Sequence, residues 1–174
     1  GAKVVNVKED TDNREMPPCM IVSSDGTYMY ATTDLATIYN RFHEYNPDHV
    51  LYVVDARQGL YFEQVYRVSD KVGLISKDKL EHTAFGTING SDGKPFKTRS
   101  GETLKLDDLI SEVKTSFISK REENKNMSEE DIDIIVNAII KYADLQNNRA
   151  KSYNFDIAKF SDVSGKTGPY ILYS

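Results

Sequence analysis

A run of five apolar residues, Val50–Val54, constrains the fold of this chain more than any other feature. Pro47 and Asp55 bound the run, which predicts a short strand that is buried on both faces. Apolar residues at helical spacing flank it: Leu35, Ile38, Tyr39 and Phe42 come before it, and Tyr61, Val65, Val68 and Val72 come after it. A buried strand between two helices is typical of a parallel sheet with crossover helices, so the predicted fold class is α/β.

Further strands are expected from short apolar runs, and the aromatic segment Tyr28–Tyr30 is also strand-prone. Residues 4–7 and 20–22 are interpreted as a hairpin with a long loop, and residues 82–88 as another strand that ends at Asn89-Gly90. This number of strands is small for a complete doubly wound sheet.

Helix boundaries are expected from capping residues. One of Thr32, Thr33 and Asp34 is expected to cap the first helix, and residues 46–48 are expected to end it. A further helix is predicted over 106–117. Another is predicted from its cap at Ser128 to Leu145, with three acidic residues at its positive end.

Composition excludes several classes of protein. Hydrophobic residues make up 39% of the 174 residues and charged residues 28%, which predicts a soluble globular chain rather than a disordered one. No apolar run approaches the roughly 20 residues of a membrane helix, and there is no signal-peptide layout, so we expect no membrane partner. A single cysteine excludes an internal disulfide and fits a reducing cytoplasm, which is the expected location. The net charge of -5 argues against a main nucleic-acid platform. The one cysteine, Cys19, lacks the companions of a zinc site.

A cationic loop at residues 92–101 carries the clearest chemical signal. Its cations are Lys94, Lys97 and Arg99, and glycines lie near both of its ends. Such a loop can stabilise the charge that develops when pyrophosphate leaves. The alternative is a solvated turn between two elements. The glycine spacing does not match that of a P-loop.

Polar residues follow two of the expected strands, where ligands bind in open α/β sheets. Gln58 comes after the Val50–Val54 strand and its neighbour Asp55, and Tyr30 and Asp34 occupy the preceding strand-to-helix junction. A phenol close to a carboxylate suits a cationic, hydrogen-bonding ligand such as guanidinium. The alternatives are that Asp55 and Gln58 cap a helix, that Asp34 is a helix N-terminal acid, and that Tyr30 belongs to the core.

His82 precedes Phe85 and Gly86 on the strand that is expected over residues 82–88. One interpretation places His82 at a nucleotide, with backbone groups near Phe85 and Gly86 holding an adenine edge. The other is a histidine whose hydrogen bonds are satisfied within the strand.

Five segments, in chain order, resemble motifs of one enzyme family, the class I arginyl-tRNA synthetases of bacterial type. They are Ser24–Ala36, Tyr52–Gln58 with its Asp-x-x-Gln, His82–Gly86, Lys94–Gly101 and Thr167–Tyr173. Together they span nearly the whole chain. The resemblance is to the C-terminal half of the catalytic domain, and it implies a partial Rossmann-like parallel sheet with crossover helices, followed by helices.

The resemblance implies an activity and the residues that carry it. The family joins arginine to tRNA(Arg) with ATP, through an arginyl-adenylate, and magnesium accompanies the ATP. By resemblance, Tyr30, Asp34 and Gln58 hold the arginine side chain, and His82, Phe85 and Gly86 lie near adenosine. Lys97 and Lys94 act on the triphosphate, and Arg99 is a candidate to compensate for a missing lysine. No zinc and no other metal ligand are implied.

Two departures from the family pattern set further expectations. The loop reads Phe-Lys-Thr-Arg-Ser instead of Lys-Met-Ser-Lys-Ser, and no His-x-Gly-His motif is present. We therefore expect residues 1–105 to be the second half of a nucleotide-binding catalytic domain that includes the loop 92–101. Residues 106–174 are then a helical segment that leads toward a missing anticodon-binding domain. Such a fragment is expected to be inactive alone and to self-associate through an exposed apolar strip.

Two other classes of function stay open from the sequence. The first is a non-catalytic α/β module that binds arginine or a nucleotide. The second is a structural α/β domain without a ligand, although the motif residues at strand ends argue against it.

Overall fold

The computed structural model describes residues 1–96, 105–120 and 127–174. They form two compact units, Gly1–Ala84 and Phe85–Ser174, each of which is described by itself. The predicted division at residue 105 concerns the domains of a whole enzyme and stays a prediction. Within the described parts of the chain, no helix has the length and apolar character needed to cross a membrane.

The first unit begins with the predicted hairpin. Strands β1 (Lys3–Val5) and β2 (Cys19–Val22) pair antiparallel, and an isolated bridge joins Val22 to Tyr28. The loop between the two strands is tied to the rest of the unit by Arg67, which donates hydrogen bonds to both carboxylate oxygens of Asp12, at 2.6 and 2.7 Å.

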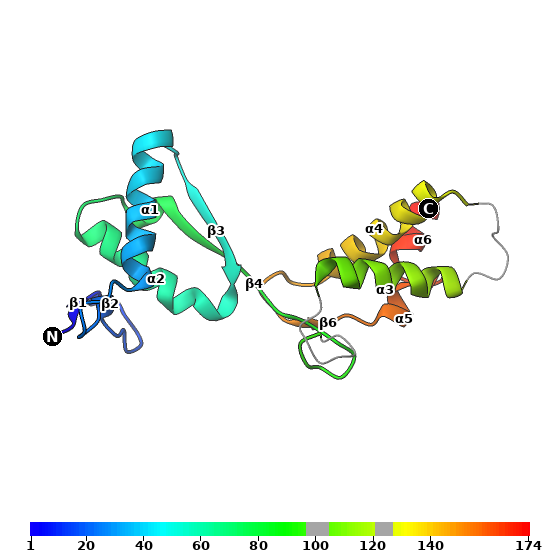
Figure 1. The fold of residues 1–174 in the computed structure, drawn as a ribbon, viewed down its shortest axis with the longest axis horizontal. Helices are drawn as coiled ribbons and strands as arrows, with labels where there is room; N and C mark the ends of the chain where they lie inside the picture. Colours follow the sequence, from blue (N-terminus) through cyan, green and yellow to red (C-terminus); the bar gives the residue numbers. More distant parts are fainter. Residues whose placement is uncertain (97–104, 121–126) are drawn as a thin grey trace. The chain divides into compact units, whose positions relative to one another are not determined.

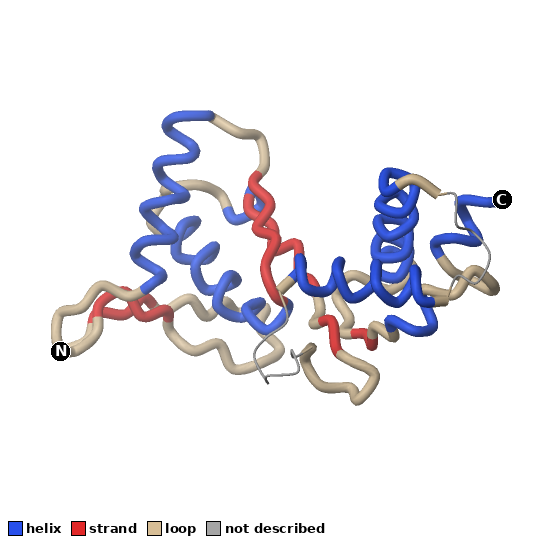
Figure 2. Tube along the Cα trace, turned by 45° about the vertical axis from the view of Figure 1, so that its right-hand side comes forward, coloured by secondary structure: helices blue, strands red, loops and turns tan. Residues whose placement is uncertain are grey.

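An α/β layer follows the hairpin. Its elements are α1 (Tyr30–Tyr45), β3 (Val50–Asp55), the short helix η1 (Ala56–Gln58), α2 (Gly59–Lys71), the short helix η2 (Lys77–Lys79) and β4 (Leu80–Phe85). Strands β3 and β4 are hydrogen-bonded neighbours that run in the same direction, and α2 is the crossover between them. Helices α1 and α2 lie on one side of this pair (Figures 1 and 2). The predicted α/β class with a crossover helix is therefore confirmed.

The expectation that the Val50–Val54 strand is buried on both faces is wrong. Val50, Tyr52 and Val54 pack against the core, whereas Leu51 is 56% exposed and Val53 is 65% exposed. The two helices cover only one face of the pair, so alternate residues of β3 have no cover within the described part of this unit. An exposed apolar strip of the predicted kind is thus present on β3.

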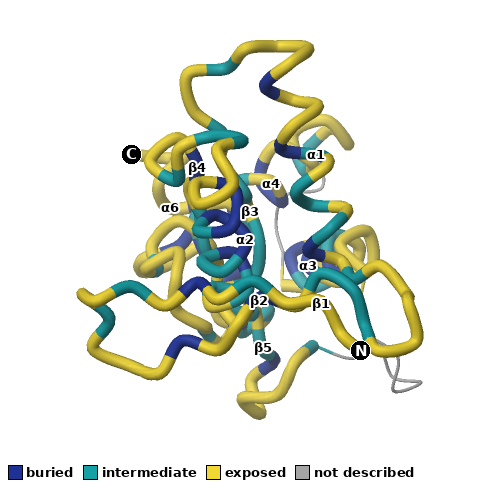
Figure 3. The backbone as a smooth tube through the Cα atoms, turned by 90° about the vertical axis from the view of Figure 1, so that its left-hand side faces the viewer, coloured by how far each residue is buried: buried dark blue, intermediate teal, exposed yellow. Residues whose placement is uncertain are grey.

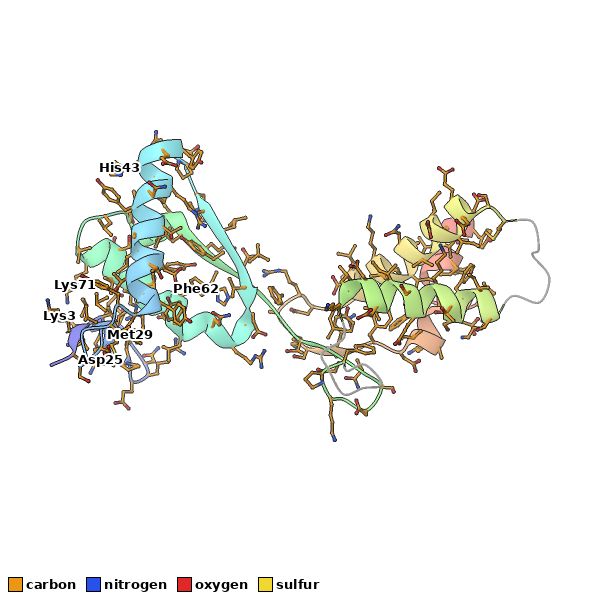
Figure 4. The ribbon with its side chains drawn as sticks, viewed as in Figure 1. Lys3, Asp25, Met29, His43, Phe62 and Lys71 are labelled. Carbon is orange, nitrogen blue, oxygen red and sulfur yellow. The ribbon has the colours of Figure 1, made fainter. Side chains whose placement is uncertain are left out.

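Helix α1 begins earlier than its predicted caps. Met29 is the N-cap and contributes no side-chain hydrogen bond, so the prediction that Thr32, Thr33 or Asp34 caps the helix is wrong. These residues lie within the helix, where the Thr32 hydroxyl donates to the Ile21 carbonyl at 2.7 Å. The helix ends as predicted, at Asn46 in the left-handed region with φ 42°. In Figure 4, Met29 and His43 mark its two ends.

The core of the first unit lies between the helices and the inner face of the strands. Ile38 of α1 and Val65 of α2 are fully buried, and Val68 is 2% exposed. These positions recur at the spacing that the sequence predicts for an amphipathic helix, and the buried turns of α2 are dark blue in Figure 3.

The second unit combines a short strand pair with helices. Strand β5 (Ile88–Asn89) pairs in parallel with β6 (Tyr153–Asn154), and the helices are α3 (Leu106–Ser119), α4 (Glu129–Leu145), α5 (Ile157–Phe160) and α6 (Gly168–Tyr173). The predicted capping of α4 by Ser128 is confirmed, because its hydroxyl accepts from the Asp131 amide at 3.1 Å. The prediction of one strand over 82–88 is wrong: the chain leaves the sheet at Gly86-Thr87, between β4 and β5.

Candidate substrate-binding site

The N-terminal turns of α1 hold the first two predicted site residues. Tyr30 is the first residue of the helix, and Asp34 follows four residues later, so both side chains lie on the same helical face. Tyr30 is 83% exposed, which excludes the alternative that it belongs to the core of this unit. Asp34 is half-buried.

Asp34 faces helix α2, where it meets a residue that sequence reasoning assigned to packing. The Tyr61 hydroxyl donates a hydrogen bond to Oδ2 of Asp34. Burial raises the pKa of Tyr61, and the bond to the carboxylate raises it further. Tyr61 therefore keeps its proton and acts as a donor at neutral pH. Its place in the apolar repeat of α2 explains why the sequence suggested a core residue and gave no signal for a site.

Gln58 lies at the carboxyl end of β3, as predicted, on the exposed surface at the start of α2. It is the N-cap residue of that helix, but its side chain makes no capping hydrogen bond. Within the first unit it is therefore free to bind a ligand, and the alternative that its side chain caps the helix is wrong.

Asp55, by contrast, caps a helix, which is the alternative interpretation of this residue. One of its oxygens accepts from the backbone N–H and Nε of Arg57, at 2.8 and 2.9 Å, and the other accepts from Nη2 at 2.8 Å. These hydrogen bonds lower the pKa of Asp55 to about 2. Both carboxylate oxygens are thus occupied, by the cap of η1 and by the ion pair with Arg57.

His82 lies on β4, and its ring has a hydrogen-bond partner and a stacking partner within the first unit. Its Nε2 is 3.0 Å from the Val54 carbonyl oxygen, which only accepts, so Nε2 carries the proton. The ring stacks on Phe62, with centroids 5.3 Å apart and an interplanar angle of 29°. These contacts match the alternative of a satisfied histidine, and a role for His82 at a nucleotide stays a prediction.

In the second unit, Gly86 is held against the segment that follows α4. Its amide donates to the Arg149 carbonyl at 2.8 Å, and a Cβ on Gly86 would lie 2.2 Å from the Lys151 carbonyl carbon. Only glycine permits this approach. Phe85 is 40% exposed. A cavity of about 460 Å³ opens beside these two residues, and its other walls are Ile88, Asp144, Leu145, Asn147, Asn148, Arg149, Lys151 and Tyr153.

The described part of the cationic loop is a tight turn in the second unit. Gly93 has φ 74°, the Gly90 amide donates to the Lys94 carbonyl at 2.8 Å, and the Lys94 amide donates to Asp92 at 3.0 Å. Lys94 is exposed. Lys97 and Arg99 lie outside the described residues. Across residues 1–96, 105–120 and 127–174, no group of three or more histidine, cysteine and acidic side chains is placed to hold a metal ion.

Comparison with known proteins gives these residues a family context. The family model for the class I tRNA synthetases (R), catalytic domain, matches residues 1–157. The arginine–tRNA ligase of Agathobacter rectalis is 46% identical over 100% of this chain and 31% of its own length. That of Francisella tularensis subsp. novicida is 48% identical over 95% of this chain and 28% of its own length. This chain therefore spans about a third or less of these relatives.

Solved structures also match this chain. The crystal structure of arginyl-tRNA synthetase from Plasmodium falciparum matches with a TM-score of 0.71 and 26% identity, over 99% of this chain and 30% of that one. Thermus thermophilus arginyl-tRNA synthetase shares the fold, with a TM-score of 0.77 and 19% identity over 99% of this chain and 34% of that one. The match of the family model over most of the chain, and the identity to its curated members, show that this chain belongs to the class I arginyl-tRNA synthetase family.

Proposed function

We propose that this chain is the part of an arginine–tRNA ligase that holds the arginine side chain and contributes to the ATP site. The whole enzyme activates arginine with ATP, as arginyl-adenylate, and transfers it to tRNA(Arg), with Mg²⁺ bound to the ATP and without zinc. The single observation that carries this proposal is the 46% identity to an arginine–tRNA ligase across the entire chain.

The first unit supports the arginine part of the proposal. Asp34 supplies a carboxylate, Tyr30 an exposed ring one turn away, and Gln58 an exposed amide at the carboxyl end of β3. A guanidinium has five N–H donors and no acceptor, so carboxylate and amide oxygens suit it. We propose that Asp34 pairs with the guanidinium while Tyr30 and Gln58 line its path.

The ATP part of the proposal depends on other residues. His82 and the backbone of Phe85 and Gly86 are proposed to lie near adenosine, as the resemblance to the family implies. Lys97, with Lys94 and Arg99, is proposed to stabilise the triphosphate and the leaving pyrophosphate. The buried, reduced Cys19 fits the cytoplasm as the compartment of the enzyme.

Arginine-dependent exchange of pyrophosphate into ATP by the whole enzyme tests the proposal. Asp34→Asn keeps the shape of the side chain but removes its charge, so we expect the KM for arginine to rise about 100-fold, the effect of removing one partner of a hydrogen-bonded charge pair. Asp48→Asn, at an exposed aspartate just after α1, is the matched control and is expected to leave KM unchanged.

Three outcomes contradict the proposal. An Asp34→Asn enzyme with the wild-type KM for arginine would remove Asp34 from the arginine site. Robust exchange by the isolated 174-residue chain would contradict the view that it is only part of a catalytic unit. Tight arginine binding by the isolated chain without any exchange in the whole enzyme would instead favour a non-catalytic binding module.

A further inference from the structure

The contact between α1 and α2 involves a residue, Tyr61, that lies outside the family motifs. Asp34 is half-buried, and one of its two carboxylate oxygens, Oδ2, already accepts the Tyr61 hydroxyl. The two residues are 27 positions apart in sequence and belong to different helices. The bond therefore fixes the carboxylate relative to the crossover helix and not only relative to its own backbone.

Tyr61 is itself held on its ring side. Its ring packs edge-on against Phe62, with centroids 5.3 Å apart, and Phe62 in turn contacts Tyr52 of β3 at 5.2 Å. A phenol with a packed ring has one position for its hydroxyl, so the Asp34 rotamer is set by the core of the unit. Because burial and the carboxylate both raise the pKa of Tyr61, the donor persists at neutral and mildly alkaline pH.

A carboxylate has about four lone-pair positions, and Tyr61 occupies one of them. We propose that Tyr61 is a positioning residue for arginine recognition, which holds Asp34 so that Oδ1 and the remaining lone pair of Oδ2 face a planar guanidinium. This inference rests on the proposed function, because it assigns Tyr61 a role only if Asp34 binds arginine. A freely rotating carboxylate would pair equally well with a compact ammonium group, whereas a fixed one favours the fork of a guanidinium.

The test is Tyr61→Phe in the whole enzyme, measured by arginine-dependent pyrophosphate exchange. The substitution removes one hydroxyl and keeps the packed ring. We expect the KM for arginine to rise about tenfold, as for the loss of one hydrogen bond to a charged group, with kcat and the KM for ATP nearly unchanged. The preference for arginine over lysine should fall by a similar factor.

Tyr66→Phe is the matched control. Tyr66 lies on the same helix, it is 8% exposed, and its hydroxyl is buried without a hydrogen-bond partner among the described residues. Tyr66→Phe removes the same atom from the same helix, but the Tyr66 hydroxyl makes no hydrogen bond to Asp34, so the KM for arginine should stay at the wild-type value.

A double-mutant cycle separates positioning from a general structural effect. If Tyr61 acts through Asp34, Tyr61→Phe should have almost no effect on KM in an Asp34→Asn enzyme. Equal effects in both backgrounds would overturn the inference, and so would a wild-type KM in Tyr61→Phe alongside a raised KM in Asp34→Asn. A wild-type KM in Asp34→Asn itself would overturn the proposed arginine site instead, so the two failures are distinguishable.

Discussion

The pair formed by Arg67 and Asp12 is the best-defined ionic contact of the first unit. Both side chains are largely buried, at 10% and 6% exposure, and Arg67 also donates to the Val7 carbonyl at 3.0 Å and to Glu63 at 2.6 Å. The hydrogen bonds from Arg67 hold the pKa of Asp12 well below its usual range. The stability that this ion pair gives to the loop over residues 6–18 therefore depends on pH.

The sign of the pH effect follows from the lowered pKa of Asp12. Its contribution to stability is fully present above the unfolded-state pKa, about 3.9, and is lost as the pH falls through the lower folded-state value. Asp12→Asn should thus lower the free energy of unfolding at pH 7 and at pH 5 by the same amount, and by less at pH 3. Urea unfolding at the three pH values measures this, with the exposed Asp10→Asn as control. A constant difference down to pH 3 would contradict the assignment.

At the scale of elements, local signals and tertiary contacts differ in what they reveal. Helix α4 could be predicted to the residue, because Ser128 satisfies its own capping box within three positions. The half-exposed β3 could not, because exposure depends on how many layers cover the strand. The same holds for the bond from Tyr61 to Asp34, since nothing in the sequence around either residue specifies a partner 27 positions away.

The break between β4 and β5 gives a test at this scale. Gly86→Ala would place a methyl group 2.2 Å from the Lys151 backbone, so the strand end or the 148–152 segment must move. We expect the second unit to lose about 1–3 kcal/mol of stability, the usual cost of overpacking. Thermal unfolding measures it. Gly59→Ala is the control, because its nearest neighbour, the His82 ring, is an ordinary 3.6 Å away, and it should be nearly neutral.

At the scale of the whole molecule, the fold leaves an apolar strip on β3 without cover in the first unit. Leu51 and Val53 both lie on this strip. Exposed apolar patches of this kind mark surfaces that bind another surface. This chain spans about a third or less of the length of its relatives.

We therefore expect the isolated chain to self-associate, and a paired change of Leu51 and Val53 to lysine to weaken that association by at least tenfold. Sedimentation velocity over a range of concentrations measures it. Ile134→Lys, at a 52% exposed position on α4, is the control for added charge. A wild-type chain that stays monomeric at high concentration would contradict the expectation.

The pairing of Asp55 with Arg57 also shapes the field that an approaching ligand meets. A carboxylate and a guanidinium 2.8 Å apart act at a distance as a dipole, and the potential of a dipole decays faster than that of a single charge. The end of β3 therefore contributes little long-range attraction for cations. Asp34 differs, because its partner is a neutral phenol that leaves its charge uncancelled. Electrostatic steering of a cationic substrate toward this unit should accordingly depend on Asp34, in the N-terminal turns of α1, far more than on Asp55 at the end of β3.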